Sequence, residues 1–260
     1  MSINNIDKFK RKIADKKTCI GMLVTLSDMT VSEIAGDVGY DFTWIDMEHA
    51  PHTIESVMRH IIALRGTDCA PFVRVPWNEH WVIKTVLDLA PAGVIIPMVN
   101  TAEEAEDAVA ACRYPPKGRR GCGVRRASRY GQINFNDYLE TSKKEPMVII
   151  QIEHVEAVKN LDAILQVPGI DSICVGPCDL SGSMGKLNQL KDPEVCKVID
   201  EVCRKTLKAG LMLGTAGGPL EVCLKRGIQW VALGSDCGGI ISQAATTLKH
   251  AQTLSNSIYV

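Results

Sequence analysis

The sequence predicts a single-domain α/β protein, a (β/α)8 TIM barrel that spans residues 1–260. Three observations support this fold: eight short apolar runs are bounded by turn residues, helical patterns lie between them, and the length suits one large domain. Strict alternation of strands and helices implies a parallel sheet with helices outside it, and eight units favour a closed barrel. An open doubly wound sheet is the alternative, but no GxGxxG motif follows the first strand.

The eight apolar runs are rich in hydrophobic and β-branched residues, which is typical of strands that are buried on both faces. They cover residues 18–24, 41–47, 71–76, 93–99, 147–153, 172–177, 211–216 and 230–236. Catalytic groups of a barrel of this kind lie at or just beyond the carboxyl ends of its strands. The polar residues that follow these runs are therefore the candidates for a functional site.

Helix signals lie between the runs. Apolar residues at helical spacing predict one buried face within residues 53–66, made of Ile54, Val57, Met58, Ile61 and Ile62. Thr101 and Glu104 have the spacing of a capping box. Asp192 followed by Pro193 predicts the start of a helix that ends at Gly210.

Residues 112–146 break the regular spacing and predict an extended loop rather than a second domain. Six basic residues lie in this segment between Lys117 and Arg129. A solvated loop or an arginine-rich subunit contact explains them more simply than attraction of anionic substrates, which is the alternative.

Composition limits the possible partners and the compartment. The net charge of −1 gives no reason to expect a nucleic-acid partner, and no apolar run reaches the length needed to span a membrane. The N-terminal residues are polar and lack the apolar core of a secretory signal. The ten cysteines are scattered without a CxxC pair, which favours free thiols in a reducing cytoplasm.

Two acids follow neighbouring strands of the predicted barrel. Gln151 and Glu153 end the fifth run on one face, and Asp179 follows the sixth after a Gly-Pro turn. Because adjacent strands lie about 4.8 Å apart, the two carboxylates can converge on one ion. Two carboxylates with open positions suit Mg²⁺ or Mn²⁺, with Co²⁺ as a possible substitute, although structural salt bridges would also explain them.

Basic groups accompany these acids at the strand ends. Arg74 lies inside the third run, where burial requires an anion such as an α-keto acid or its enolate. His49 follows the second run and is the natural group for proton transfer, with a hydrogen-bonded core histidine as the alternative. Asp88, Asp46 and Glu48 are candidates to orient it. No lysine occupies a strand end, which favours metal–enolate over imine chemistry.

Residues just after the sixth run offer backbone donors. The N–H groups of Cys178 and Asp179 can meet a substrate carboxylate, whereas Pro177 has none to give. The Cys178 thiol has no basic neighbour in sequence, so we do not expect it to act as a nucleophile.

Taken together, the motifs WIDMEHAPH, FVRVPW, GVIIPMVNTAEEA, RYPPKGRRG, QIE and GPCDLSGSMG resemble those of the HpcH/HpaI aldolases, class II pyruvate aldolases, over about residues 18–250. The resemblance implies a divalent metal on Glu153 and Asp179. It implies pyruvate contacts from Gln151 and from the backbone of Cys178 and Asp179. By the same resemblance Arg74 stabilises the enolate, His49 transfers a proton and Asp88 supports the histidine.

The resemblance also implies an activity and an assembly. The expected reaction is reversible cleavage of a 4-hydroxy-2-oxo acid to pyruvate and an aldehyde. A citrate-lyase-β-like or malyl-CoA-lyase-like enzyme acting on a thioester is one alternative, and a non-catalytic barrel that binds keto acids is another. The family implies a homo-hexamer, a trimer of dimers, in which the C-terminal helix within GIISQAATTLKHAQTLS is exchanged between subunits.

Overall fold

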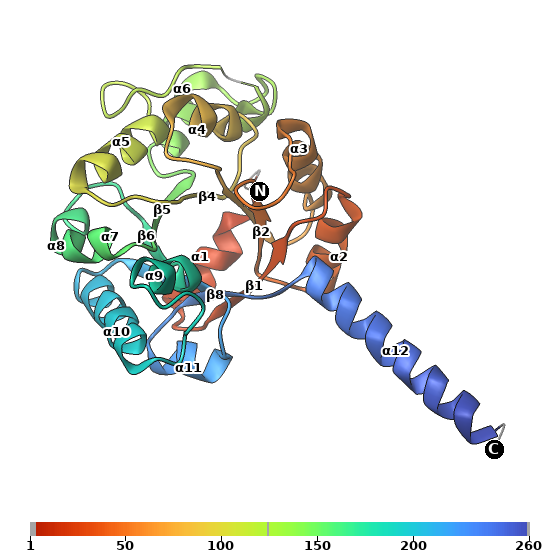
Figure 1. The fold of residues 1–260 in the computed structure, drawn as a ribbon. Coiled ribbons are helices and arrows are strands. Elements are labelled where there is room, and N and C mark those ends of the chain that lie inside the picture. Colours follow the sequence, from red (N-terminus) through yellow and green to blue (C-terminus); the bar gives the residue numbers. More distant parts are fainter. Residues whose placement is uncertain (1–3, 124, 259–260) are drawn as a thin grey trace.

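The computed structural model describes residues 4–123 and 125–258, and its centre is a closed barrel of parallel strands (Figure 1). The strands follow one another around the barrel in chain order, and β8 pairs with β1 through Cys19 and Trp230. They are β1 (Cys19–Val24), β2 (Phe42–Asp46), β3 (Ala70–Arg74), β4 (Gly93–Ile96), β5 (Met147–Ile152), β6 (Ser172–Val175), β7 (Met212–Ala216) and β8 (Trp230–Ser235). The predicted TIM barrel is confirmed, and each predicted run contains a strand.

Twelve α-helices are described, and most of them surround this barrel on the outside (Figure 1). They are α1 (Ile6–Ala14), α2 (Thr30–Val38), α3 (Ile54–Ala63), α4 (His80–Leu87), α5 (Ala102–Cys112), α6 (Phe135–Ser142), α7 (Val155–Lys159), α8 (Leu161–Ile164), α9 (Pro177–Ser183), α10 (Pro193–Lys208), α11 (Leu220–Lys225) and α12 (Asp236–Ile258). A short 3₁₀ helix, η1, covers Arg126–Ser128. In the described part of the chain no helix is both long and apolar enough to cross a membrane.

Two helix signals from the sequence are confirmed and one is only partly right. The capping box at α5 forms, with the Glu104 N–H donating to Thr101 Oγ1 at 3.2 Å and the Thr101 N–H donating to Glu104 Oε2 at 3.2 Å. Asp192 caps α10, which ends at Lys208 just before Gly210. On α3, Ile54 and Ile62 are 38% and 44% exposed. The buried stripe of α3 is narrower than predicted because the helix lies over the barrel with only its central face in contact.

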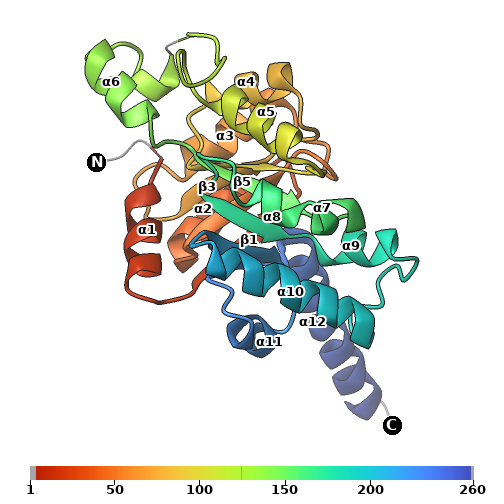
Figure 2. The ribbon, with the colours of Figure 1, turned by 90° about the vertical axis from the view of Figure 1, so that its left-hand side faces the viewer.

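The N-terminal helix closes one end of the barrel, a role that the polar N-terminal sequence did not reveal. Ile6 and Phe9 of α1 are fully buried, and the Phe9 ring lies 4.9 Å from that of Phe72 inside the barrel. Lys12 pairs with Asp41 at 2.6 Å. Figure 2 shows α1 on the side opposite α9, so α1 covers the amino ends of the strands and leaves the carboxyl ends open.

Large aromatic side chains fill the barrel interior. Trp44 and Trp230 are fully buried, and the Trp230 indole N–H donates to Ser172 Oγ at 2.9 Å. Gly214 on β7 leaves the space that this indole needs, because a Cβ at Gly214 would lie 1.9 Å from the Trp230 side chain. The interior is therefore a packed core, and a site for a small molecule must lie at an end of the barrel.

The segment from 113 to 146 is more ordered than the extended loop that the sequence predicted, since it contains η1 and α6. Three of its arginines, Arg113, Arg120 and Arg126, are buried rather than solvated. Arg120 Nη2 donates to the Leu87 carbonyl at 3.2 Å, and Arg126 Nη1 donates to the Leu89 carbonyl at 2.9 Å. These carbonyls lie at the end of α4, where they lack partners within the helix. The basic segment thus caps α4 from outside.

The C-terminal helix α12 leaves the barrel and extends away from it (Figure 1). Several of its large apolar side chains are exposed, namely Ile240, Ile241, Leu248 and Leu254. A row of exposed apolar groups on a projecting helix is typical of a surface that another protein chain covers.

Candidate active site at the carboxyl ends of the strands

Glu153 forms the centre of the candidate site. It directly follows β5, is 2% exposed, and accepts hydrogen bonds from the Met98 N–H at 2.8 Å and from the Gln151 side-chain amide. Gly176, at the end of β6, lies against it, because a Cβ on this glycine would be 2.7 Å from Glu153 Oε2. The glycine lets the turn into α9 pass close to the carboxylate, and Asp179 lies in the first turn of that helix.

Three carboxylates lie within electrostatic range of one another at this end of the barrel. Burial raises the pKa of Glu153 to about 7, and the nearby carboxylates of Glu48 and Asp179 contribute to this increase. The two hydrogen bonds that Glu153 accepts have the opposite effect and lower the pKa. Burial also raises the pKa of Glu48, and Asp179 adds to that shift. The three residues follow β2, β5 and β6, so negative charge from separate strands gathers at one mouth.

The donor set at this mouth fits a divalent cation. A group of three or more His, Cys, Asp or Glu side chains placed to hold a metal is absent from the described residues. Glu153 and Asp179 are two acids at this mouth whose carboxylates lie within electrostatic range of each other. Both side chains are hard oxygen donors. Their carboxylates and that of Glu48 repel one another, and a bound cation would reduce this repulsion. Gln151 Oε1 is buried beside them without a hydrogen-bond partner. Mg²⁺ and Mn²⁺ accept few protein ligands and fill the remaining positions with water or substrate.

Arg74 is held at the end of β3 by two protein carboxylates. Its Nε donates to Asp46 Oδ1 at 2.9 Å, its Nη2 to Asp46 Oδ2 at 2.6 Å, and its Nη1 lies 2.8 Å from Glu48 Oε2. Burial opposes ionisation of Asp46, but the hydrogen bonds from Arg74 hold the pKa of this carboxyl below its ordinary value. The sequence-based argument that burial of Arg74 calls for an anionic ligand is therefore corrected, because Asp46 and Glu48 already compensate its charge.

His49 lies on the turn after β2, with its side chain 63% exposed at the mouth. Its Nε2 is 3.8 Å from Glu48 Oε2. The N–H groups of Glu48 and His49 both donate to Asp46 Oδ1, at 3.0 and 3.4 Å, which winds the turn around that carboxylate. Of the three acids considered as partners for the histidine, Glu48 is the one that this chain places beside it.

Asp88 and Cys178, the two remaining candidate residues, lie in different parts of the barrel. Asp88 follows α4 and lies 3.5 Å from Arg120 Nη2, at the amino ends of the strands. A barrel helix runs antiparallel to its strand, so the end of α4 returns to the face opposite His49, and Asp88 and His49 do not meet within one chain. Cys178 has an exposed thiol next to Asp179, and its carbonyl accepts from Ser181 Oγ at 2.7 Å.

The sequence did not reveal that Asp46 clamps Arg74. The two residues are direct register partners on neighbouring strands, β2 and β3. An acid and a base at the ends of two consecutive buried strands are a signal that could have predicted the pair, because matched strand ends bring such side chains together.

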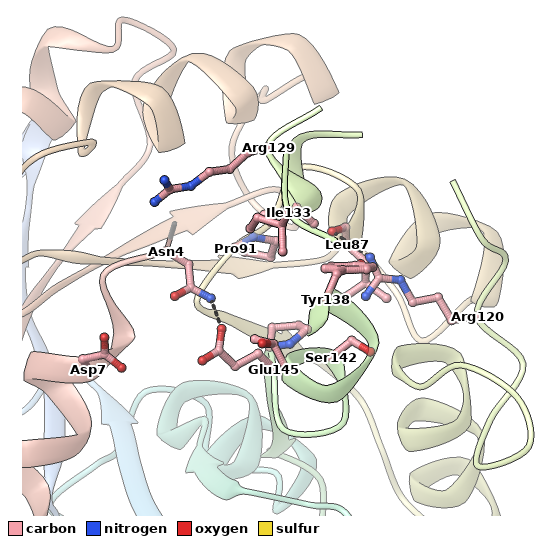
Figure 3. Close-up of a pocket in the computed structure, with 14 residues that line it drawn as sticks. Asn4, Asp7, Leu87, Pro91, Arg120, Arg129, Ile133, Tyr138, Ser142 and Glu145 are labelled. Atoms are coloured by element: carbon pink, nitrogen blue, oxygen red, sulfur yellow. Dashed lines mark hydrogen bonds between the residues drawn. The ribbon is translucent and has the colours of Figure 1, made fainter. Parts of the chain in front are cut away.

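A separate cavity of about 350 Å³ lies at the other end of the barrel (Figure 3). Its walls include Leu87, Tyr138 and Pro146, and Asn4 donates to Glu145 across one side at 2.8 Å. Glu145 and Pro146 directly precede β5 and Leu87 ends α4, so the cavity belongs to the face with the amino ends of the strands. It is remote from the carboxylates at the mouth and is not part of the candidate active site.

Comparison with known proteins identifies the family of this chain. Residues 19–243 match the model of the HpcH/HpaI aldolase/citrate lyase family. A hydroxypyruvate/pyruvate aldolase of Roseobacter denitrificans is 37% identical over 91% of this chain and 94% of its own length. A 5-keto-4-deoxy-D-glucarate aldolase of Escherichia coli is 40% identical over 89% and 91%. An HpcH/HpaI aldolase/citrate lyase family structure from Burkholderia cenocepacia superposes with a TM-score of 0.89 at 28% identity, covering 95% of this chain and 99% of that one. The chain belongs to the HpcH/HpaI aldolase/citrate lyase family.

Proposed function

We propose that this protein is a divalent-metal-dependent aldolase that reversibly cleaves a 4-hydroxy-2-oxo acid to pyruvate and an aldehyde. The observation that carries the proposal is the gathering of Glu153, Asp179 and the clamped Arg74 at one mouth of the barrel. The relatives named above are aldolases, which supports the same class of reaction. The ten free cysteines support a cytoplasmic location.

Glu153 and Asp179 would hold the cation, for which Mg²⁺ and Mn²⁺ suit the oxygen donors best and Co²⁺ is a substitute. When bound, the cation supplies Lewis-acid stabilisation of the charge that develops on the keto-acid carbonyl oxygen. The backbone N–H groups of Cys178 and Asp179 and the amide of Gln151 orient the keto acid by hydrogen bonding. The fixed guanidinium of Arg74 adds positive charge where the enolate oxygen forms, without reorganising during the reaction.

His49 is the proposed proton-transfer group. Its exposed side chain can reach the hydroxyl of a 4-hydroxy-2-oxo acid at the mouth, remove that proton during cleavage, and return it to the aldehyde oxygen during addition. Glu48 orients the imidazole from within the same chain. Asp88 can support a histidine only across a subunit contact, because its own chain places it at the opposite face.

The aldolase proposal is tested by mixing the purified protein with pyruvate and a panel of aldehydes, each with Mg²⁺, Mn²⁺ or Co²⁺. We expect carbon–carbon bond formation that a chelator abolishes and the added metal restores. Product is detected by chromatography, and cleavage by release of pyruvate. A full rate in excess chelator would contradict metal dependence. Turnover of 3-hydroxy thioesters but of no keto acid would replace this activity with that of a thioester lyase.

We further propose that the chain forms a hexamer, a trimer of dimers, in which α12 packs on a neighbouring subunit. The projecting helix and its exposed apolar residues support this assembly. Replacing Ile241 and Leu248 together by Glu should reduce the mass in solution, measured by light scattering, to that of smaller species, because charge opposes burial of the helix. Thr247→Glu, on a polar position of the same helix, is the control. An unchanged hexamer of the double variant, or a monomeric wild type of 28.4 kDa, would contradict the exchange.

A further inference from the structure

A second, smaller cavity lies at the amino-end face of the barrel, between the end of α3 and η1. It has a volume of about 200 Å³ and is lined by Ile62, Arg65, Arg126, Arg129, Tyr130 and Gln132. Half of these side chains are arginines, and the lining contains no carboxylate. Arg129 also borders the larger cavity, where Figure 3 shows it on the side away from Arg120.

Arg126 is the buried cation of this group. It is 6% exposed, and its guanidinium donates to the carbonyl of Leu89, just beyond α4, at 2.9 Å. A neutral carbonyl supplies only a partial negative charge. Burial lowers the pKa of Arg126, and the neighbouring charge of Arg65 lowers it further, against an opposing effect of Tyr130. No carboxylate of the described residues offsets this charge, whereas Arg74 at the other end of the barrel has two.

We propose that this cavity binds a small oxyanion, the phosphate or carboxylate group of a metabolite. A buried guanidinium is costly unless an anion accompanies it, and the planar fork of arginine matches phosphate and carboxylate oxygens. Arg65, an exposed residue just after α3, brings a second charge to the same cavity. The site is distinct from the aldolase mouth, because α3 and α4 both end at the face opposite Glu153.

Isothermal titration with inorganic phosphate, at an ionic strength matched by sodium chloride, tests the proposal on the full-length protein. We expect saturable binding by the wild type. Arg65→Gln should weaken it roughly tenfold, because one charge-assisted hydrogen bond is lost. Arg126→Gln should weaken it at least as much. Arg65 is exposed, so its replacement leaves the fold intact even if Arg126→Gln does not.

Two controls separate this site from others. Arg59→Gln removes an exposed arginine of α3 that pairs with Glu55 at 2.6 Å, and it should leave phosphate affinity unchanged. Arg74→Lys should also leave it unchanged, because Arg74 lies at the opposite mouth. A parallel titration with succinate identifies the source of the anion, since tighter phosphate binding indicates a phosphorylated ligand and tighter succinate binding a carboxylate. No binding beyond that of chloride, or equal losses for Arg59→Gln and Arg65→Gln, would overturn the proposal.

Discussion

Replacing Glu153 by Gln is expected to abolish divalent-metal binding and aldol cleavage together. The amide keeps the shape of the side chain and can still accept from the Met98 N–H, so the fold should persist. It lacks the negative charge that a hard cation requires. Metal affinity is measured by calorimetry, cleavage by pyruvate release, and folding by circular dichroism. Glu156→Gln, an exposed acid on α7 a few residues further along, is the matched control and should behave as the wild type.

The same residue predicts how metal affinity depends on pH. Burial raises the pKa of Glu153 to about 7 in the protein without metal, so at lower pH the carboxyl is protonated. A cation must displace that proton, and apparent affinity should fall about tenfold per pH unit below 7 and level off above it. Calorimetry in buffers of different ionisation heat should also detect proton release on binding near neutral pH. Wild-type activity in Glu153→Gln, or metal affinity that stays constant from pH 5 to 8, would place the cation elsewhere.

Replacing Arg74 by Lys should lower kcat strongly and raise KM for the keto acid much less. Lysine keeps the charge but cannot donate in parallel to both oxygens of Asp46 while also reaching Glu48. The positive charge would then move relative to the developing enolate oxygen. We expect a loss in kcat of about 10²–10³, which corresponds to about 2.7–4 kcal/mol in the barrier. Steady-state kinetics at saturating metal measure both constants.

Arg59→Lys on α3 is the control for this change, because its arginine is exposed and remote from the mouth. Thermal unfolding of Arg74→Lys must also be measured, since Asp46 and Glu48 lose part of their compensation. A variant with normal kcat and only a raised KM would assign Arg74 to binding of the substrate carboxylate in the ground state. That result would contradict the role in stabilising the enolate.

The fold could be predicted because its signals are local. Strands buried on both faces need continuous apolar runs, and the helices between them need polar caps such as Thr101 and Asp192. Each of these features lies within a few residues of sequence. The order of strands also follows from the sequence, since right-handed crossovers between consecutive parallel strands leave few other arrangements. The placement of Glu153, Arg74 and His49 at one mouth follows from the fold itself, because residues after parallel strands share one end of the barrel.

Other features depend on groups that are distant in sequence, and only the tertiary structure decided them. Phe9 closes the barrel because it meets Phe72 there, although the sequence around it is polar.

The same holds for the charged residues. By itself the sequence determined which ionisable side chains end the strands. The structure decided that Asp46 and Glu48 clamp Arg74 and that Asp88 pairs with Arg120 at the far face. It also decided that Arg126 is buried with no carboxylate partner among the described residues. The physical reason is that the sequence gives only the identity of each ionisable residue. The pKa and the role of its side chain depend on burial and on partners that only the folded chain brings close to it.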